Sequence, residues 1–309
     1  MMIRIGTRGS LLALTQSANI AKLVEKLGYK TKLVPIKTSG DQSHATSFGA
    51  IGPQGVFVKE IEQALLEHNV DMAVHSYKDL PTNSPEELVI AAVPKRLDAA
   101  DMLAMRKEVV MDKDKNLSIS PNTKVGTASA RRQAWIKHFR PDITVEPIRG
   151  NVPTRIARLN DEFDGVILAA AGLERLKTSS LKDVNSKINL ENVVLRRIPT
   201  DIFVPAPAQG ALALQCRDSD IELRNVLKKL DDKCTRDCIH AERSLLALLE
   251  GGCDLAFGAY AEPNPSRKNT FILTSLLEHE GELLFSKTSG DDLINLAKTS
   301  YKTFKKKLR

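Results

Sequence analysis

The feature that most constrains the fold is an alternation, over the first two-thirds of the chain, of short apolar segments with segments whose apolar residues recur at helical spacing. The first of these elements are predicted at residues 3–6, 10–27, 32–36, 57–68, 72–74 and 88–93. The alternation recurs over residues 124–160 and in the apolar run 166–171. This pattern is typical of parallel or mixed sheets with helices on both faces. We therefore predict an α/β fold built from two such units.

The last third of the chain has a different character. A long helix is predicted over residues 235–250, followed by strands at 256–261, 271–277 and 282–287 and by a closing basic helix. That order indicates a smaller α+β domain. With a first break near residues 94–100 and a crossing loop at 203–210, the predicted domains are 1–98 with 198–216, 99–197, and 217–309.

The composition is that of a globular protein, with 309 residues, 42% hydrophobic and 27% charged. No basic-then-apolar leader precedes the first predicted strand, and no apolar run approaches the roughly 18 residues of a membrane span. Four cysteines in a chain of this length do not indicate a disulfide scaffold. We therefore expect a cytoplasmic protein with no membrane partner.

Two predicted helix starts carry arginines. Residues 126–133 read Gly-Thr-Ala-Ser-Ala-Arg-Arg-Gln, and residues 149–155 read Arg-Gly-Asn-Val-Pro-Thr-Arg, each directly after a strand-like segment. A helix N-terminus offers free N–H groups and partial positive charge, which favour anions. Guanidinium groups add two-pronged binding of carboxylate or phosphate. The pattern predicts a polyanionic ligand.

A third turn of this kind follows the first strand, where Arg8 precedes Ser10, the predicted helix cap. Residues 75–81, His-Ser-Tyr-Lys-Asp-Leu-Pro, follow another strand, and ligands of α/β sheets bind at the carboxyl ends of strands. Asp79 beside Lys78 would then face a cationic pocket. The alternative is a solvated surface turn, which this heptad alone favours. His75 is interpreted as a structural histidine.

Cys253 follows two glycines, which permit a sharp turn and leave the sulfur accessible. Its functional interpretation is a nucleophile or a covalent attachment point. The alternative is that Cys253 is a small buried residue, and the spacing alone favours this alternative. Cys234 and Cys238 lack a second pair of metal ligands, so no metal site is predicted.

Several function classes lack their motifs. The sequence holds no GxxxxGK[ST], no GxGxxG after a strand and no GxSxG. The net charge of +7 permits nucleic-acid binding, but aromatic residues are only 5% and do not interleave with basic ones. Nucleotide hydrolysis, dinucleotide redox chemistry and serine esterase activity are therefore disfavoured, and no nucleic-acid partner is expected.

Taken together, the motifs resemble the hydroxymethylbilane synthase (porphobilinogen deaminase) family from about residue 3 to residue 261. The segments that carry the resemblance are 7–14, 75–81, 126–133, 149–155, 171–176, 209–211 and 249–253. The resemblance implies two domains like those of type II periplasmic binding proteins with a cleft between them, plus the small C-terminal domain. It also implies a monomer.

The resemblance further implies a dipyrromethane cofactor held by a thioether to Cys253, onto which four porphobilinogens are condensed with release of ammonia. Asp79 is the implied catalytic acid, and it also lies among the cofactor-binding residues. The other implied cofactor-binding residues are Lys78, Ser129, Arg131, Arg132 and Arg155. The implied substrate-binding residues are Arg8, Ser10, Arg149, Arg155 and Arg175. Residues 38–55 are expected to form a lid.

Two other interpretations stay open at this point. A non-catalytic sensor of small anions would explain the arginines and the fold, but neither Cys253 nor the third domain. A basic nucleic-acid-binding protein would bind with an affinity that falls steeply with salt.

Overall fold

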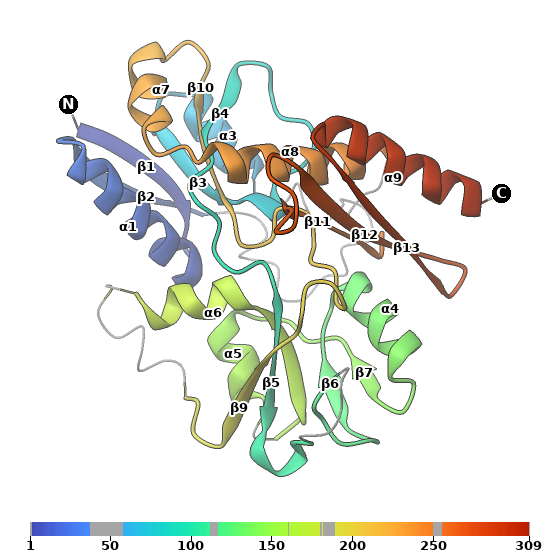
Figure 1. Cartoon of the computed structure of the whole chain (residues 1–309). Coiled ribbons are helices and arrows are strands. Elements are labelled where there is room, and N and C mark those ends of the chain that lie inside the picture. The colour runs from blue at the N-terminus through green and yellow to red at the C-terminus, as the bar shows by residue number, and fades with distance from the viewer. Residues whose placement is uncertain are drawn as a thin grey trace. The chain divides into compact units, whose positions relative to one another are not determined.

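The computed structural model describes residues 2–37, 58–111, 117–159, 161–179, 181, 189–249 and 255–308 (Figure 1). The chain forms two compact units, which are described one at a time. The first comprises Met1–Leu97, Arg175–Val184 and Gly210–Arg236, and the second Asp98–Glu174, Asn185–Gln209 and Asp237–Arg309.

The first unit contains a five-stranded mixed sheet in the order β2-β1-β3-β10-β4. Its strands are β1 (Met2–Arg8), β2 (Lys30–Ile36), β3 (Met72–Ser76), β4 (Leu88–Ala92) and β10 (Leu212–Arg217). β1 runs parallel to β2 and β3, whereas β10 is antiparallel to β3 and β4. Its helices are α1 (Leu11–Lys26), α3 (Lys59–Leu66), α7 (Ile221–Lys228) and the short 3₁₀ helix η1 (Tyr77–Asp79).

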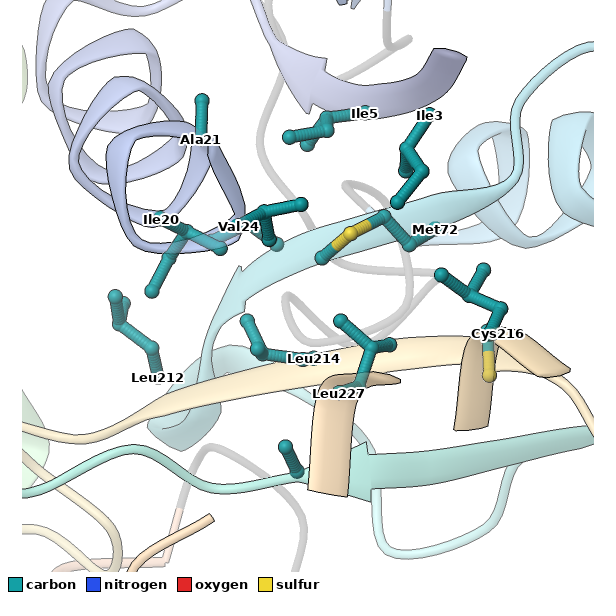
Figure 2. Close-up of a cluster of buried hydrophobic side chains, with 13 residues drawn as sticks. Ile3, Ile5, Ile20, Ala21, Val24, Met72, Leu212, Leu214, Cys216 and Leu227 are labelled. Carbon is teal, nitrogen blue, oxygen red and sulfur yellow. The ribbon is translucent and has the colours of Figure 1, made fainter. Parts of the chain in front are cut away.

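Helix α1 begins and ends where its sequence predicts. The Ser10 side chain accepts a hydrogen bond from the backbone N–H of Ala13 at 3.3 Å and so caps the first turn. The helix ends at its C-cap residue Leu27, and Gly28 then adopts a left-handed φ of 92° that suits glycine. Its buried face packs on the sheet, where Ile20 and Val24 lie among residues of β1, β3 and β10 (Figure 2). The predicted helix is confirmed.

The second unit holds another five-stranded mixed sheet, in the order β7-β6-β8-β5-β9. Its strands are β5 (Asp101–Arg106), β6 (Lys124–Gly126), β7 (Thr144–Glu146), β8 (Gly165–Ala169) and β9 (Val193–Arg197). The remaining elements are η2 (Lys107–Val109), α4 (Ala130–Phe139), α5 (Val152–Ala157) and α6 (Ala170–Lys177), the last turn of which, from Arg175 on, is counted with the first unit. β6 is parallel to β7 and β8, and β5 is antiparallel to β8 and β9.

Trp135 anchors α4 in the core of this unit. Its ring centroid lies 4.7 Å from that of Phe139 and 4.6 Å from that of Phe203, and its indole N–H donates to the carbonyl of Ile202 at 2.8 Å. The polar atom of a buried tryptophan is thereby satisfied. This contact fixes the helix whose first turn carries Arg131 and Arg132.

The C-terminal part folds as an antiparallel sheet of β11 (Phe257–Pro263), β12 (Phe271–His279) and β13 (Glu282–Gly290). Helices α8 (Lys233–Leu248) and α9 (Leu293–Lys307) accompany it, and Leu245, Phe257, Leu273 and Phe304 lie in its core. The predicted helix, three strands and closing basic helix are all present. Two mixed α/β sheets and a small antiparallel sheet with its helices confirm the predicted class of two α/β parts followed by a C-terminal α+β part.

Among the helices of the described ranges, none combines the length and the apolar character that a membrane crossing requires.

Candidate active site and anion site

In the first unit, a small pocket lies where β1 and β3 end. These neighbouring parallel strands bring the turn after β1 and the helix η1 after β3 to the same edge of the sheet. Arg8, Ser10 and Asp79, all predicted site residues, line this pocket together. A carboxylate, a guanidinium and a hydroxyl therefore face one small space. Lys78 lies in η1 next to Asp79 and is half-buried.

Two polar residues of this pocket were not predicted. Gln16 is buried on α1, and its amide nitrogen lies 3.0 Å from the hydroxyl of Ser76 at the end of β3. Both residues lie within or just beyond segments that the sequence analysis singled out. The available signal was a glutamine on the apolar face of the predicted helix 10–27, because such a position ordinarily takes an apolar residue.

His75 also lines the pocket, as a buried side chain hydrogen-bonded within the sheet. Its Nε2 atom is 2.9 Å from Oε1 of Gln215, and the amide nitrogen of Gln215 donates to Glu62 at 2.9 Å. Burial lowers the pKa of His75 to about 4, against which the Gln215 contact has the smaller effect. The ring is therefore neutral near pH 7, and the prediction of a structural histidine is confirmed.

The second unit holds a cluster of arginines around one carboxylate. Arg131 and Arg132, in the first turn of α4, are only 5% and 6% exposed. Asp101, the first residue of β5, is fully buried and lies 2.7 Å from a terminal nitrogen of Arg131 and 2.6 Å from one of Arg132. Burial alone would raise the pKa of Asp101, but the two arginines and the amide of Gln209 hold it at about 2.

Asp101 was missed by the sequence analysis. The predicted helix start is present. The arginines, however, already have a counter-charge within the protein, the carboxylate of Asp101. A single acid at the head of the apolar segment 99–105 was the signal that could have indicated burial with a cationic partner.

Arg155 is the third cation of this region. Its Nε donates to the carbonyl of Gly150 at 2.8 Å, and no carboxylate in the described part of the chain forms an ion pair with it. Burial and the charge of Arg132 both lower its pKa. Gly150 has a left-handed φ of 109°, and Asn151 caps α5 by accepting from Thr154 at 2.9 Å. The predicted strand, turn and helix start are confirmed.

The remaining predicted residues lie as follows. Ser129 is the residue that precedes α4, and its side chain makes no capping bond. Arg149 is exposed in the turn before α5. Arg175, on α6, is buried and donates to the carbonyl of Gly210 at 2.7 Å.

This donor set fits a group that carries several carboxylates. The Nε atom of Arg131 is buried and has no hydrogen-bond partner among the described residues. Two guanidinium groups share the single carboxylate of Asp101, and Arg155 is close enough for the charge of Arg132 to lower its pKa, so this cluster keeps an excess of positive charge. An unsatisfied buried donor is costly until an acceptor is bound.

Comparison with known proteins settles the family. The model of the family described as "Porphobilinogen deaminase, dipyromethane cofactor binding domain" matches residues 3–225. The chain belongs to the porphobilinogen deaminase family. A porphobilinogen deaminase of Brevibacillus brevis is 39% identical over 298 residues, covering 95% of this chain and 90% of that protein. One of Geobacillus kaustophilus is 40% identical over 278 residues, covering 89% and 84%.

Among solved structures, an ancestral cationic amino acid solute binding protein superposes on 78% of this chain and 93% of its own, with a TM-score of 0.43 and 16% identity. The porphobilinogen deaminase relatives match nearly end to end. The activity is accordingly that of porphobilinogen deaminase, or hydroxymethylbilane synthase, a transferase of tetrapyrrole biosynthesis. The family resemblance inferred from the motifs is confirmed. It is preferred to the two alternative interpretations, an anion sensor and a nucleic-acid-binding protein.

Two predicted parts of a porphobilinogen deaminase site fall outside the described residues. They are Cys253 and the lid at 38–55. Of the other cysteines, Cys234 is exposed, whereas Cys216 and Cys238 are buried.

Proposed function

We propose that Asp79 is the catalytic acid and base of the porphobilinogen condensation in this chain. The observation that supports it is the pocket at the ends of β1 and β3, where the carboxylate of Asp79 is exposed beside Arg8 and Ser10. Within the described residues, Asp79 takes part in no ion pair and no side-chain hydrogen bond. Its carboxylate is therefore available to a substrate.

The reaction requires a proton donor where the aminomethyl group of porphobilinogen leaves. The carboxyl of Asp79 donates a proton to the amine, the carbon–nitrogen bond breaks, and ammonia departs with that electron pair. The resulting carboxylate then stabilises the cationic pyrrole left behind. After the new carbon–carbon bond forms, the same carboxylate accepts the proton lost by the ring carbon, which restores the acid.

Arginines offset the charge of the substrate. Each porphobilinogen carries an acetate and a propionate, whose burial without partners would be prohibitive. We propose that substrate carboxylates are bound by a set of five residues, namely Arg8, Ser10, Arg149, Arg155 and Arg175. Arg8 and Ser10 are supported by their place on the pocket that also holds Asp79.

The cofactor carboxylates are proposed to be bound by Lys78, Ser129, Arg131, Arg132 and Arg155. The unpartnered Nε of Arg131 supports this assignment. Cys253 is the proposed attachment point, through a thioether. When bound, the dipyrromethane supplies the pyrrole end to which four porphobilinogens are added in turn.

The three-domain division with boundaries at 1–98 with 198–216, 99–197, and 217–309 is part of this proposal. It is supported by the three separate sheets, each of which falls within one of these ranges apart from Arg217, the last residue of β10. We further propose that the enzyme is a monomer that acts in the cytoplasm.

The intact mass of the acid-denatured protein tests this proposal most directly. We expect the wild-type protein to exceed its polypeptide mass by two linked pyrrole units, and the Cys253→Ser variant to lack the excess. Cys234→Ser, an exposed cysteine on α8, is the matched control and should keep it. A bare polypeptide mass for wild type, unchanged after incubation with porphobilinogen, would refute the proposed attachment.

A further inference from the structure

We propose that Asp101 is a positioning residue that holds the guanidinium groups of Arg131 and Arg132 ready for the carboxylates of the cofactor. The inference rests on the proposed function of these two arginines. Asp101 itself acts only through them.

One carboxylate serves both guanidinium groups. Oδ2 of Asp101 lies 2.7 Å from a terminal nitrogen of Arg131. Oδ1 accepts from Arg132 twice, at 2.6 Å from a terminal nitrogen and at 3.1 Å from Nε. Since Asp101 is fully buried, no solvent competes for these contacts. The two planar groups are therefore held on opposite oxygens of one fixed carboxylate.

Electrostatics explain why an anion site contains an acid. Two adjacent buried guanidinium groups repel one another, and burial together with the charge of Arg132 lowers the pKa of Arg131 while Asp101 opposes the shift. One negative charge against two positive charges leaves an excess of one for the ligand. The pair can thus remain charged and ordered before the ligand arrives, which removes an ordering cost from binding.

Further contacts hold both arginines and the carboxylate in place. Terminal nitrogens of Arg131 and Arg132 donate to the carbonyls of Val204 and Ile167 at 2.7 and 2.8 Å. Arg131 also stacks over the ring of Phe203, 5.2 Å from its centroid. The amide of Gln209 donates to Asp101 at 3.0 Å and to the carbonyl of Ala99 at 2.8 Å, so the carboxylate is itself held in place.

The experiment compares loaded and cofactor-free protein for each variant. Cofactor-free protein is made in cells that cannot produce porphobilinogen and is then loaded by adding porphobilinogen, with the loaded fraction read from intact mass. The measured quantity is the rise in thermal midpoint on loading. Loss of a purely structural contact lowers both midpoints alike, whereas loss of positioning reduces the difference between them.

We expect Asp101→Asn to reduce this rise to less than half of the wild-type value and to lower kcat/KM by about tenfold or more. Asp142→Asn is the matched control, because Asp142 makes a two-pronged ion pair with Arg140 in the same unit and no contact with the cluster. It should lower both midpoints and leave their difference unchanged. A wild-type rise in Asp101→Asn, or equal effects of the two variants, would overturn the inference.

Should Asp101→Asn fail to fold, Asp101→Glu decides, because it keeps the negative charge but moves the carboxylate by one methylene. A reduced rise on loading supports positioning, and an unchanged rise overturns it. If wild-type protein itself gains no mass from porphobilinogen, the proposed function fails and takes the inference with it. If wild type loads and only the Asp101 result is negative, the inference alone fails.

Discussion

His75 donates its Nε2 proton to Gln215 across the buried face of the first sheet, at 2.9 Å. The direction follows from the next contact, because the carboxylate of Glu62 can only accept, so the amide nitrogen of Gln215 must point to it. The amide oxygen of Gln215 is then left for His75. The neutral Nε2–H form of the ring is thereby selected.

This arrangement predicts an acid-sensitive fold. The pKa of His75 is about 4 in the folded state, below its usual 6.5, so the unfolded chain binds the proton first as the pH falls. Stability is unaffected above about pH 6.5 and declines towards pH 4, by about 3 kcal/mol in all. Urea midpoints from pH 7 to 4.5 should therefore fall less steeply for His75→Asn than for wild type.

The control for that measurement is His138→Asn, at an exposed histidine of α4. It should retain the wild-type slope. Parallel slopes for wild type and His75→Asn would show that another group causes the acid sensitivity.

Asp79→Asn should nearly abolish turnover while leaving the protein folded. The amide has the same shape but neither donates nor accepts a proton at neutral pH, and general acid–base catalysis contributes about 10²–10⁴-fold. Steady-state consumption of porphobilinogen measures the loss. Glu86→Gln changes an exposed acid in the loop after η1 and should leave the rate intact. Wild-type turnover in Asp79→Asn would refute the proposed role.

The described cysteines should differ sharply in reactivity. Burial raises the pKa of Cys216 to about 11, so a thiolate is scarce at pH 8, whereas Cys234 is exposed. Under native conditions iodoacetamide should modify Cys234 at least about 100-fold faster than Cys216. Peptide mass spectrometry over time gives both rates, and denatured protein provides the reference. Comparable native rates would contradict the burial of Cys216.

Arg217 should contribute strongly to the stability of the first unit. This buried side chain of β10 donates to the carbonyls of Leu65 at 2.6 Å and Val70 at 2.9 Å, around the end of α3. Arg217→Met removes both of these buried hydrogen bonds, leaving the carbonyl of Leu65 to the backbone N–H of His68, and should lower the free energy of unfolding by about 2–3 kcal/mol. Arg224→Met breaks only an exposed pair with Asp218 and should change it by less than about 0.5 kcal/mol. Equal denaturant midpoints for the two variants would contradict this account.

Local features of the fold were predictable from sequence, and distant pairings were not. Ser10, Gly28 and the turn before α5 act on their own neighbours, so caps and helix starts could be located from residue type and spacing. Asp101 meets Arg132 across 31 positions and Gln16 meets Ser76 across 60. No periodic pattern encodes such pairs, because which strands become neighbours is decided by the packing of the whole sheet.

The same long reach affects synthesis of the chain. Strand β10 inserts between β3 and β4, and Gln215 pairs with His75 across 140 positions. A ribosome therefore finishes the strands of the second mixed sheet, the last ending at Arg197, before it makes the strand that completes the first. Until then β3 and β4 of the nascent chain keep open edges, which invite aggregation. The first sheet is translated early but cannot be completed until β10 has been made. We therefore expect chains truncated before residue 212 to depend on chaperones.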